Sequence, residues 1–323
     1  MLAADGVRIT ILVENWIDIL IPGSEGISRR GLVFHFDPKE QTLLAENGLS
    51  LLIETFTGGK RSCVLFDSGL TADVIRHNFA ALRLDPRDID HIVISHGHLD
   101  HHGGLNGFLP SIGHPVPILV HPDAFLPRYA VMGTGEVAAY YNQPLDQEEL
   151  KALGARFVLA RDPVVVAPAV WSTGEIPREN DFEGPGTEGK ALAYGPGIYQ
   201  LVDGRYVYDE VMDEVGLAIN VAGEGLVVIT GCGHAGVINT VRRAQGITGV
   251  EELALVMGGF HLGFPGTPDE KIDKTVDALR TLGAKRIAPM HCSGFKCMAD
   301  VARALPNAFF QYAVGTSITV GRV

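Results

Sequence analysis

Four residues that commonly bind metals stand together in the sequence His96-Gly-His-Leu-Asp-His101. A short apolar run that is typical of a buried strand precedes them. Gly97 allows a tight turn after that strand, so the imidazoles of His96 and His98 can converge on one ion. Asp100 and His101 follow closely enough to bind a second ion beside the first. Imidazole nitrogen and carboxylate oxygen suit Zn²⁺, Mn²⁺ or Fe²⁺.

The alternative interpretation is a histidine-rich surface loop that binds no metal. Four ligand-type residues at this spacing, directly after an apolar strand, favour a metal site over such a loop. We therefore predict two divalent ions side by side, with zinc as the first choice and manganese or iron as alternatives. Asp100 is also predicted to be catalytic, because it could orient a water molecule or accept its proton.

Three further histidines follow apolar runs in the second half of the chain. His291 comes after the predicted strand Ala284–Pro289, and His234 comes after the predicted strand Gly225–Thr230. Both are predicted to complete the metal site, because side chains at strand ends can reach the same ions. His261 also follows an apolar run, and it could bind either a metal or the substrate.

Together these residues resemble the metallo-β-lactamase superfamily, whose signature H-x-H-x-D-H is matched at every defined position. Val64–Gly69 resembles its first motif, in which an aspartate after a strand, here Asp67, supports the metal loop. Gly225–Gly231 resembles the strand that carries the bridging acid of the family. Cys232 stands where that aspartate is usual, a position at which some members use cysteine. Cys232 could bridge the ions as a thiolate, or it could be a small buried residue.

A narrower resemblance concerns one branch of this superfamily. The segments that carry it are Leu51–Thr55, Thr230–Thr240, Met257–Leu262 and Met290–Gly294. The branch includes dihydropterin-ribofuranosyl-aminobenzene-phosphate synthases of the methanopterin pathway and many bacterial proteins of unknown substrate. The resemblance implies a metal-dependent hydrolase with an αββα sandwich, in which two mixed sheets face each other and helices lie outside.

The elements that must position these residues follow from apolar periodicity and from Gly, Pro and Asp at the boundaries. The predicted strands are Val7–Val13, Leu49–Thr55, Ser62–Phe66, His91–Ser95, Val116–Val120, Ala155–Leu159, Leu217–Val221, Gly225–Thr230, Glu252–Met257 and Ala284–Pro289, with two more at the C-terminus. The predicted helices are Thr71–Leu82, Asp146–Leu153, Val237–Gln245, Asp269–Leu282 and Cys297–Leu305. Two facing sheets with helices outside would bury this pattern, so an α/β fold in a single domain, 1–323, is predicted.

Residues 163–208 differ from the rest in being rich in Gly, Pro and charged side chains. This composition predicts a long, partly irregular insertion. Such segments are often functional, so we expect it to form part of the wall over the metals. Arg128, Glu175, Arg178 and Lys190 offer charges that could bind a small polar substrate.

The composition of the 323 residues, 46% hydrophobic and 20% charged, predicts a globular protein and excludes a disordered chain. The net charge of -12 disfavours nucleic acid and anionic lipid as partners. Four irregularly spaced cysteines do not form a disulfide framework, which favours the reduced cytoplasm. The apolar N-terminus lacks the basic region of a signal peptide. No apolar run reaches the ~20 residues of a membrane span.

These features predict a hydrolase in which two ions activate a water molecule that attacks a small substrate of the ester, lactone or phosphoester type. One alternative is a phosphate-releasing or cyclising synthase of pterin metabolism, and another is a non-catalytic, metal-dependent binding protein. A redox di-iron protein of the same fold is disfavoured, because such proteins typically carry Glu where this chain has His98. The bond that is cleaved and the oligomeric state stay open.

Overall fold

The computed structural model describes residues 2–30, 39–131, 137–140, 145–184 and 197–323. Its first sheet has the strand order β2 (Ile27–Ser28), β18 (Ser317–Gly321), β1 (Gly6–Val13), β3 (Ser50–Thr57), β4 (Lys60–Phe66), β5 (His91–Val93), β6 (Val116–Val120) and β9 (Ala155–Leu159). The second has the order β10 (Val164–Ala167), β11 (Val170–Ser172), β14 (Leu217–Val221), β15 (Gly225–Thr230), β16 (Leu253–Gly259) and β17 (Ile287–Met290). Both sheets combine parallel and antiparallel pairs.

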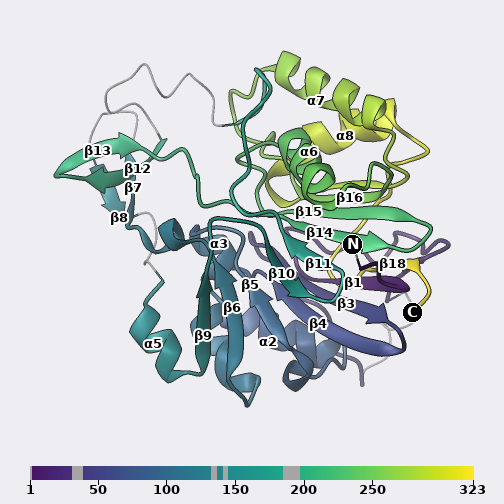
Figure 1. Cartoon of the computed structure of the whole chain (residues 1–323), viewed down its shortest axis with the longest axis horizontal. Coiled ribbons are helices and arrows are strands. Elements are labelled where there is room, and N and C mark those ends of the chain that lie inside the picture. Colours follow the sequence, from purple (N-terminus) through teal and green to yellow (C-terminus); the bar gives the residue numbers. More distant parts are fainter. Residues whose placement is uncertain (1, 31–38, 132–136, 141–144, 185–196) are drawn as a thin grey trace.

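Helices cover the outer face of each sheet (Figure 1). The first sheet packs against α2 (Ala72–Ala81), α4 (Leu105–Phe108) and α5 (Gln147–Ala152). The second sheet packs against α6 (Val237–Thr248), α7 (Asp269–Leu282) and α8 (Gly294–Ala304). Apart from α4, which has no counterpart among the predicted helices, these helices agree with the predicted ones to within a few residues at each end.

The apolar residues form three layers, which is what a four-layer sandwich requires. In β15 the side chains of Val227 and Ile229 join the core between the two sheets, whereas Leu226 and Val228 join the core under the helices. This alternation follows from the two-residue period of a strand, and burial of both faces explains the unbroken apolar run. The predicted αββα sandwich is confirmed.

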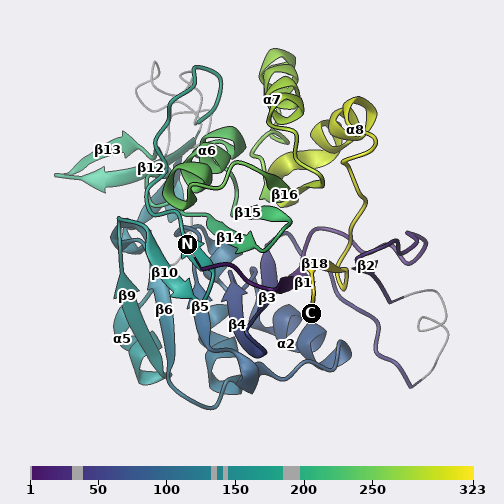
Figure 2. The same ribbon diagram turned by 45° about the vertical axis from the view of Figure 1, so that its right-hand side comes forward.

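A third sheet, which the sequence pattern does not predict, lies at one end of the sandwich (Figure 2). Its strand order is β13 (Arg205–Tyr208), β12 (Gly197–Val202), β7 (Arg128–Val131) and β8 (Val137–Tyr140). The segment 163–208 is therefore more regular than predicted. It supplies β10 and β11 to the second sheet and β12 and β13 to the third, while 185–196 lie outside the described residues.

The C-terminal segment also differs from the prediction, since β18 is the one strand that forms after α8 in the fully described residues 305–323. Phe309 makes only an isolated bridge to Ile287, and the chain then turns at Ala313–Thr316 before entering β18. β18 then pairs with β1, so the first and last strands of the chain lie side by side (Figure 1). Within the described part of the chain, no helix combines the length and apolarity needed to cross a membrane.

Candidate metal centre

The predicted ligands His96, His98 and His101 lie together just after β5. Their imidazole rings form a cluster in which the centroid of His96 is 4.6 Å from that of His98 and 4.2 Å from that of His101. Asp100 and His101 lie on α3 (Leu99–His102), a single helical turn, and not on a loop as predicted. Backbone bonds from the N–H of His101 to the carbonyl of His98, at 3.0 Å, and from the N–H of Gly103 to the carbonyl of Leu99, at 2.7 Å, close this turn.

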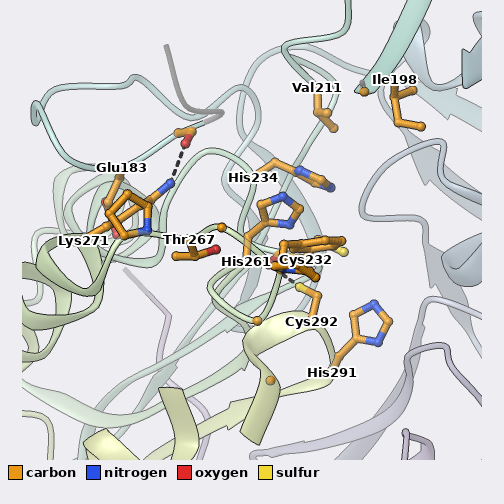
Figure 3. A pocket seen from close by; sticks show the side chains of 18 of the residues that line it. Glu183, Ile198, Val211, Cys232, His234, His261, Thr267, Lys271, His291 and Cys292 are labelled. Atoms are coloured by element: carbon orange, nitrogen blue, oxygen red, sulfur yellow. Dashed lines mark hydrogen bonds between the residues drawn. The ribbon is translucent and has the colours of Figure 1, made fainter. Parts of the chain in front are cut away.

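Histidines of the second sheet meet this cluster from the opposite side. The ring of His234, which follows β15, lies 4.9 Å from the rings of both His96 and His98. The ring of His291, which follows β17, lies 5.0 Å from that of His101. All six predicted ligands therefore gather where strands of both sheets end, and Figure 3 shows His234 and His291 facing the same space.

Two groups of donor atoms can be distinguished within the cluster. Asp100, His101, Cys232 and His291 have donor atoms that all lie within 4.8 Å of one another, and so do His96, Cys232 and His234. Cys232 belongs to both groups, and its Sγ lies 3.1 Å from His101 Nε2. This is the location that a bridging ligand would need. His98 contacts the second group through its ring.

The donor atoms fit divalent metal ions. Among the described residues, the buried Nε2 atoms of His96 and His234 have no hydrogen-bond partner. An orphaned buried nitrogen is unfavourable unless its lone pair binds something, and a cation satisfies that need. Burial lowers the pKa of both histidines well below the usual value, which keeps them in the neutral form that coordinates metals.

Asp67 holds the first-sheet ligands in orientation. Its carboxylate lies 2.6 Å from His101 Nδ1, and it accepts hydrogen bonds from the backbone N–H and the hydroxyl of Ser95, each at 2.7 Å. The hydroxyl of Ser95 in turn lies 2.9 Å from His96 Nδ1. Burial opposes the charged form of His101, but Asp67 and Asp100 outweigh it and raise its pKa. Both Nε2 atoms are thereby directed at the centre.

Asp100 faces both the metal cluster and the pocket. Its Oδ2 lies 3.2 Å from His291 Nε2, and its side chain keeps 16% exposure. Burial opposes ionisation, but His101 and His291 outweigh this effect and hold the pKa of Asp100 below its usual value. Asp100 is therefore a carboxylate at neutral pH, which is the form that binds a cation or accepts a hydrogen bond from water.

The backbone of His291 is held by two residues that follow directly on β1 and that sequence reasoning did not identify. The Glu14 carboxylate accepts the N–H of His291 at 3.0 and 3.1 Å, while the Asn15 amide donates to its carbonyl at 3.0 Å. These bonds hold His291 at a φ of 50°. Burial raises the pKa of Glu14 to about 7. An acid directly after a largely apolar strand was the available signal.

Glu214 has the corresponding role for His234. Its carboxylate accepts the N–H groups of Gly233 at 2.6 Å and Ala235 at 2.7 Å, one on each side of the ligand. Burial raises the pKa of Glu214, because the three-residue loop encloses the carboxylate completely. No local pattern in the sequence distinguishes this glutamate from others.

Arg128 supports the metal loop and does not bind substrate as predicted. Its guanidinium is fully buried and pairs with the carboxylates of Asp209 and Asp213. Asp213 also accepts the N–H of Gly97 at 2.7 Å, and Arg128 donates to the carbonyl of Gly97 at 3.3 Å. The first residue of the third sheet thereby fixes the peptide between His96 and His98.

The other charges proposed for substrate binding do not line the pocket or lie outside the described residues. Glu175 forms an ion pair with Arg161 at 2.8 Å, and Arg178 hydrogen-bonds the backbone of Glu210. Neither side chain borders the pocket. Lys190 lies outside the described residues.

A pocket of about 1070 Å³ opens over the predicted ligands. Its floor includes His98, Asp100, Cys232, His234 and His291, and its walls come from 181–184, 197–198 and 263–268 and the start of α7. Part of the predicted insertion therefore forms the wall, as expected.

His261 lies at the edge of the cluster, beside this pocket. Its ring centroid is 4.0 Å from that of His234 and 4.4 Å from that of Phe264 (Figure 3). This location leaves both predicted roles, metal ligand and substrate contact, available to His261.

Comparison with known proteins agrees with this geometry. The profile described as Metallo-beta-lactamase superfamily matches residues 44–237. The chain is 39% identical to the 7,8-dihydropterin-6-methyl-4-(beta-D-ribofuranosyl)-aminobenzene-5'-phosphate synthase of Methanocaldococcus jannaschii. The 254 aligned residues cover 78% of this chain and 82% of that protein. The chain is also 31% identical to an uncharacterized protein of the same organism over 280 residues, or 85% of this chain and 94% of that protein.

Solved structures show the same fold. The crystal structure of Tm1679, a metal-dependent hydrolase of the beta-lactamase superfamily, aligns with a TM-score of 0.70 at 24% identity over 98% of this chain and 100% of that chain. A diphosphatase from the PhnP family aligns with a TM-score of 0.50 at 15% identity over 98% and 97%. From its profile match, its curated relatives and its sandwich of sheets, this chain belongs to the metallo-β-lactamase superfamily.

Proposed function

We propose that this protein is a metal-dependent hydrolase that acts on a small polar substrate of the ester, lactone or phosphoester type. The observation that carries the proposal is that seven donor side chains from both sheets cluster at the base of one pocket, which five of them line. Membership in a superfamily of mostly hydrolytic enzymes supports it. The proposed ligands are His96, His98 and His234 for one ion and Asp100, His101 and His291 for the other, with Cys232 between them.

When bound, two divalent ions such as Zn²⁺ would polarise a substrate oxygen and lower the pKa of a water molecule. The other contributions come from the chain itself. Asp100 faces the pocket as a carboxylate, so it can orient the attacking water by accepting its hydrogen bond and can take up its proton. Asp67 keeps Nδ1 of His101 engaged, which leaves Nε2 directed at the site.

The pocket walls bear on the class of substrate. Phe264 and Phe182 supply aromatic surface, and Lys271 supplies positive charge at the start of α7, where Lys274 is paired with Glu270 at 2.9 Å. A molecule with a flat apolar part and an anionic group would match both features. The volume of about 1070 Å³ accommodates a molecule larger than a simple ester.

A second candidate function is the phosphate-releasing or cyclising synthase of pterin metabolism. The 39% identity to the Methanocaldococcus jannaschii synthase favours it, because that identity extends over most of both chains. Both candidates use the same metal centre and pocket. A direct assay for formation of the pterin-containing product, run beside hydrolysis assays, separates them.

The test of the metal-centred proposal is the substitution Asp100→Asn. We expect two ions per wild-type chain by elemental analysis, and turnover of at least one ester, lactone, phosphodiester or pterin-pathway substrate. Asn keeps the shape of Asp100 but removes its charge, so the variant should fold normally, bind less metal and react at least ~100-fold more slowly.

The matched control for that substitution is Asp73→Asn on α2, whose aspartate side chain is 90% exposed, and it should behave as wild type. A D100N variant that turns over the best substrate at the wild-type rate would contradict metal-centred catalysis. If the fully metallated wild type turned over nothing in the panel, the binding-protein interpretation would replace the enzyme.

A further inference from the structure

A third group of donor atoms lies beside the main metal centre. Cys232, His261 and Cys292 have donor atoms that all lie within 4.8 Å of one another. Figure 3 shows the two sulfur atoms and the imidazole of His261 gathered on one side of the pocket, apart from His291. Neither the superfamily signature nor the proposed hydrolytic mechanism uses Cys292.

The topology of the second sheet explains why these three residues meet. Cys232 follows β15, His261 follows β16, and Cys292 lies in the short 3-10 turn that follows β17 (His291–Ser293). The three strands are parallel neighbours, so their carboxyl ends share one edge of the sheet. Each strand therefore delivers one donor to the same place.

Gly259 at the end of the middle strand makes room for this approach. A Cβ atom at that position would lie only 2.7 Å from Cys292 Sγ and 2.7 Å from the Cys232 carbonyl oxygen. Without a side chain there, the thiol of Cys292 crosses β16 and donates a hydrogen bond to the Cys232 carbonyl at 2.9 Å. The two cysteines thus reach each other across an intervening strand.

Cys232 and Cys292 are both free cysteines whose sulfurs are close enough to share a cation. A metal ion between two sulfurs, each ~2.3 Å away, holds the sulfurs nearly ~4 Å apart. All three donor atoms lie within 4.8 Å of one another, a range that includes this separation.

His261 supplies an independent observation that points to a ligand. Among the described residues, its buried Nδ1 has no hydrogen-bond partner. The residue also adopts a φ of 51°, which non-glycine residues rarely do. The backbone thus holds an imidazole with an unused nitrogen next to two thiols.

We propose that Cys232, His261 and Cys292 form a site for one thiophilic cation, such as Cd²⁺ or an additional Zn²⁺, at the edge of the pocket. Two thiolates and one imidazole are the ligands that soft and borderline ions prefer. The site shares Cys232 with the main centre, so a cation there competes for the thiolate proposed to lie between the two catalytic ions. Excess thiophilic metal should therefore inhibit the enzyme.

The experiment titrates Cd²⁺ into reduced, zinc-loaded protein and follows the thiolate-to-cadmium absorption in the ultraviolet, with elemental analysis after desalting. The wild type should bind one Cd²⁺ per chain in addition to its zinc. Cys292→Ser should lose part of the absorption and weaken Cd²⁺ binding by more than ~100-fold, since losing even an outer partner of a ligand weakens binding ~10–100-fold. His261→Asn should also weaken it.

The matched control is Cys297→Ala, which removes a fully buried cysteine of α8 that is not in the group. It should bind Cd²⁺ as the wild type does. Wild-type Cd²⁺ affinity and absorption in both the Cys292 and the His261 variants would overturn the proposal. The zinc content measured before Cd²⁺ is added tests the main centre separately. If the protein takes up no zinc at all but still binds Cd²⁺ through Cys292, the proposed function is contradicted, whereas the proposed Cd²⁺ site is supported.

Discussion

Buried acids next to the ligands decide how the metal-binding side chains of this protein are oriented. Asp67 contacts an imidazole nitrogen directly, whereas Glu14 and Glu214 hold the backbone on which a ligand sits. An imidazole nitrogen becomes a good ligand only when the opposite nitrogen or the backbone is fixed by such a partner. These acids should therefore affect metal affinity although they are not expected to touch the ions.

The first prediction concerns Asp67→Asn. The asparagine amide would donate to His101 Nδ1, which moves the imidazole proton to Nε2, the nitrogen that must face the metal. Asp67 has a φ of 59°, which asparagine tolerates, so the backbone should be kept. Metal affinity should fall by ~10–100-fold in a competition assay with a chromogenic chelator. Asp73→Asn is the control, and equal affinities in the two variants would contradict the orienting role.

A second prediction concerns Glu214→Ala. Removing the carboxylate leaves the buried N–H groups of Gly233 and Ala235 without acceptors, at a cost of ~1–3 kcal/mol each. The free energy of unfolding should drop accordingly, and metal content should fall because the loop of His234 loosens. Denaturant unfolding measures the first effect. The half-exposed Glu224, changed to Ala, should alter stability by less than ~0.5 kcal/mol, and a similar loss there would refute the argument.

Sequence reasoning identified the residues that cluster as candidate ligands and, through the family resemblance, Asp67, but not Glu14 or Glu214. His96, His98, Asp100 and His101 are close in sequence, so their spacing alone indicates a metal site. By contrast, Glu14 is 277 positions away from His291, and no local pattern records such a pair. Identifying these partners requires knowing which strand ends meet, which only the folded chain shows.

At the scale of elements, the third sheet is tied to the metal loop by a buried ionic group. Arg128, at the start of β7, lies between Asp209 and Asp213 and also contacts the peptide of Gly97. Three charged groups removed from water are stable only if each is compensated by the others. A change in the third sheet should therefore be transmitted to the residues on either side of Gly97.

This arrangement predicts that Arg128→Met destabilises the protein by ~3–5 kcal/mol, because two buried carboxylates lose their counter-charge. The triple variant Arg128→Met, Asp209→Asn, Asp213→Asn should recover much of that loss, since no uncompensated charge remains and the amide oxygen introduced at position 213 can still accept from the N–H of Gly97. Denaturant midpoints of the three proteins measure both effects. A single variant as stable as wild type, or a triple variant no better than the single, would contradict it.

The elements themselves were predicted well where both faces of a strand are buried and poorly at the edges. β15 and β16 read as continuous apolar runs because cores lie on both sides of them. β12 and β13 lie beyond the sandwich, and half-exposed residues such as Leu201 and Val207 dilute the apolar signal. β10 and β11 are short strands in a Gly- and Pro-rich segment. That composition predicted an irregular segment, although the two strands pair with each other in the second sheet.

At the scale of the whole molecule, the proposed metal centre joins two halves that also share an apolar core and buried hydrogen bonds such as the one from His291 to Glu14. His96, His98 and His101 come from the first sheet, whereas His234 and His291 come from the second. The pattern of strands and helices was sufficient to predict the four layers. It could not show that the strand ends of both sheets face one pocket, because that depends on how the sheets pack.

Because ligands from both halves must come together to bind, metal ions should stabilise the fold as well as support catalysis. A ligand that binds only the folded state contributes ~2.7 kcal/mol at 100 times its Kd and ~4.1 kcal/mol at 1,000 times. The Tm should therefore rise steadily with the logarithm of free Zn²⁺ and fall when a chelator is added, as measured by scanning calorimetry. His101→Ala should flatten this dependence, while the surface variant Asp73→Asn should keep it. If the Tm changes with neither zinc nor chelator, the two halves come together without the ions and the metal centre does not bridge them.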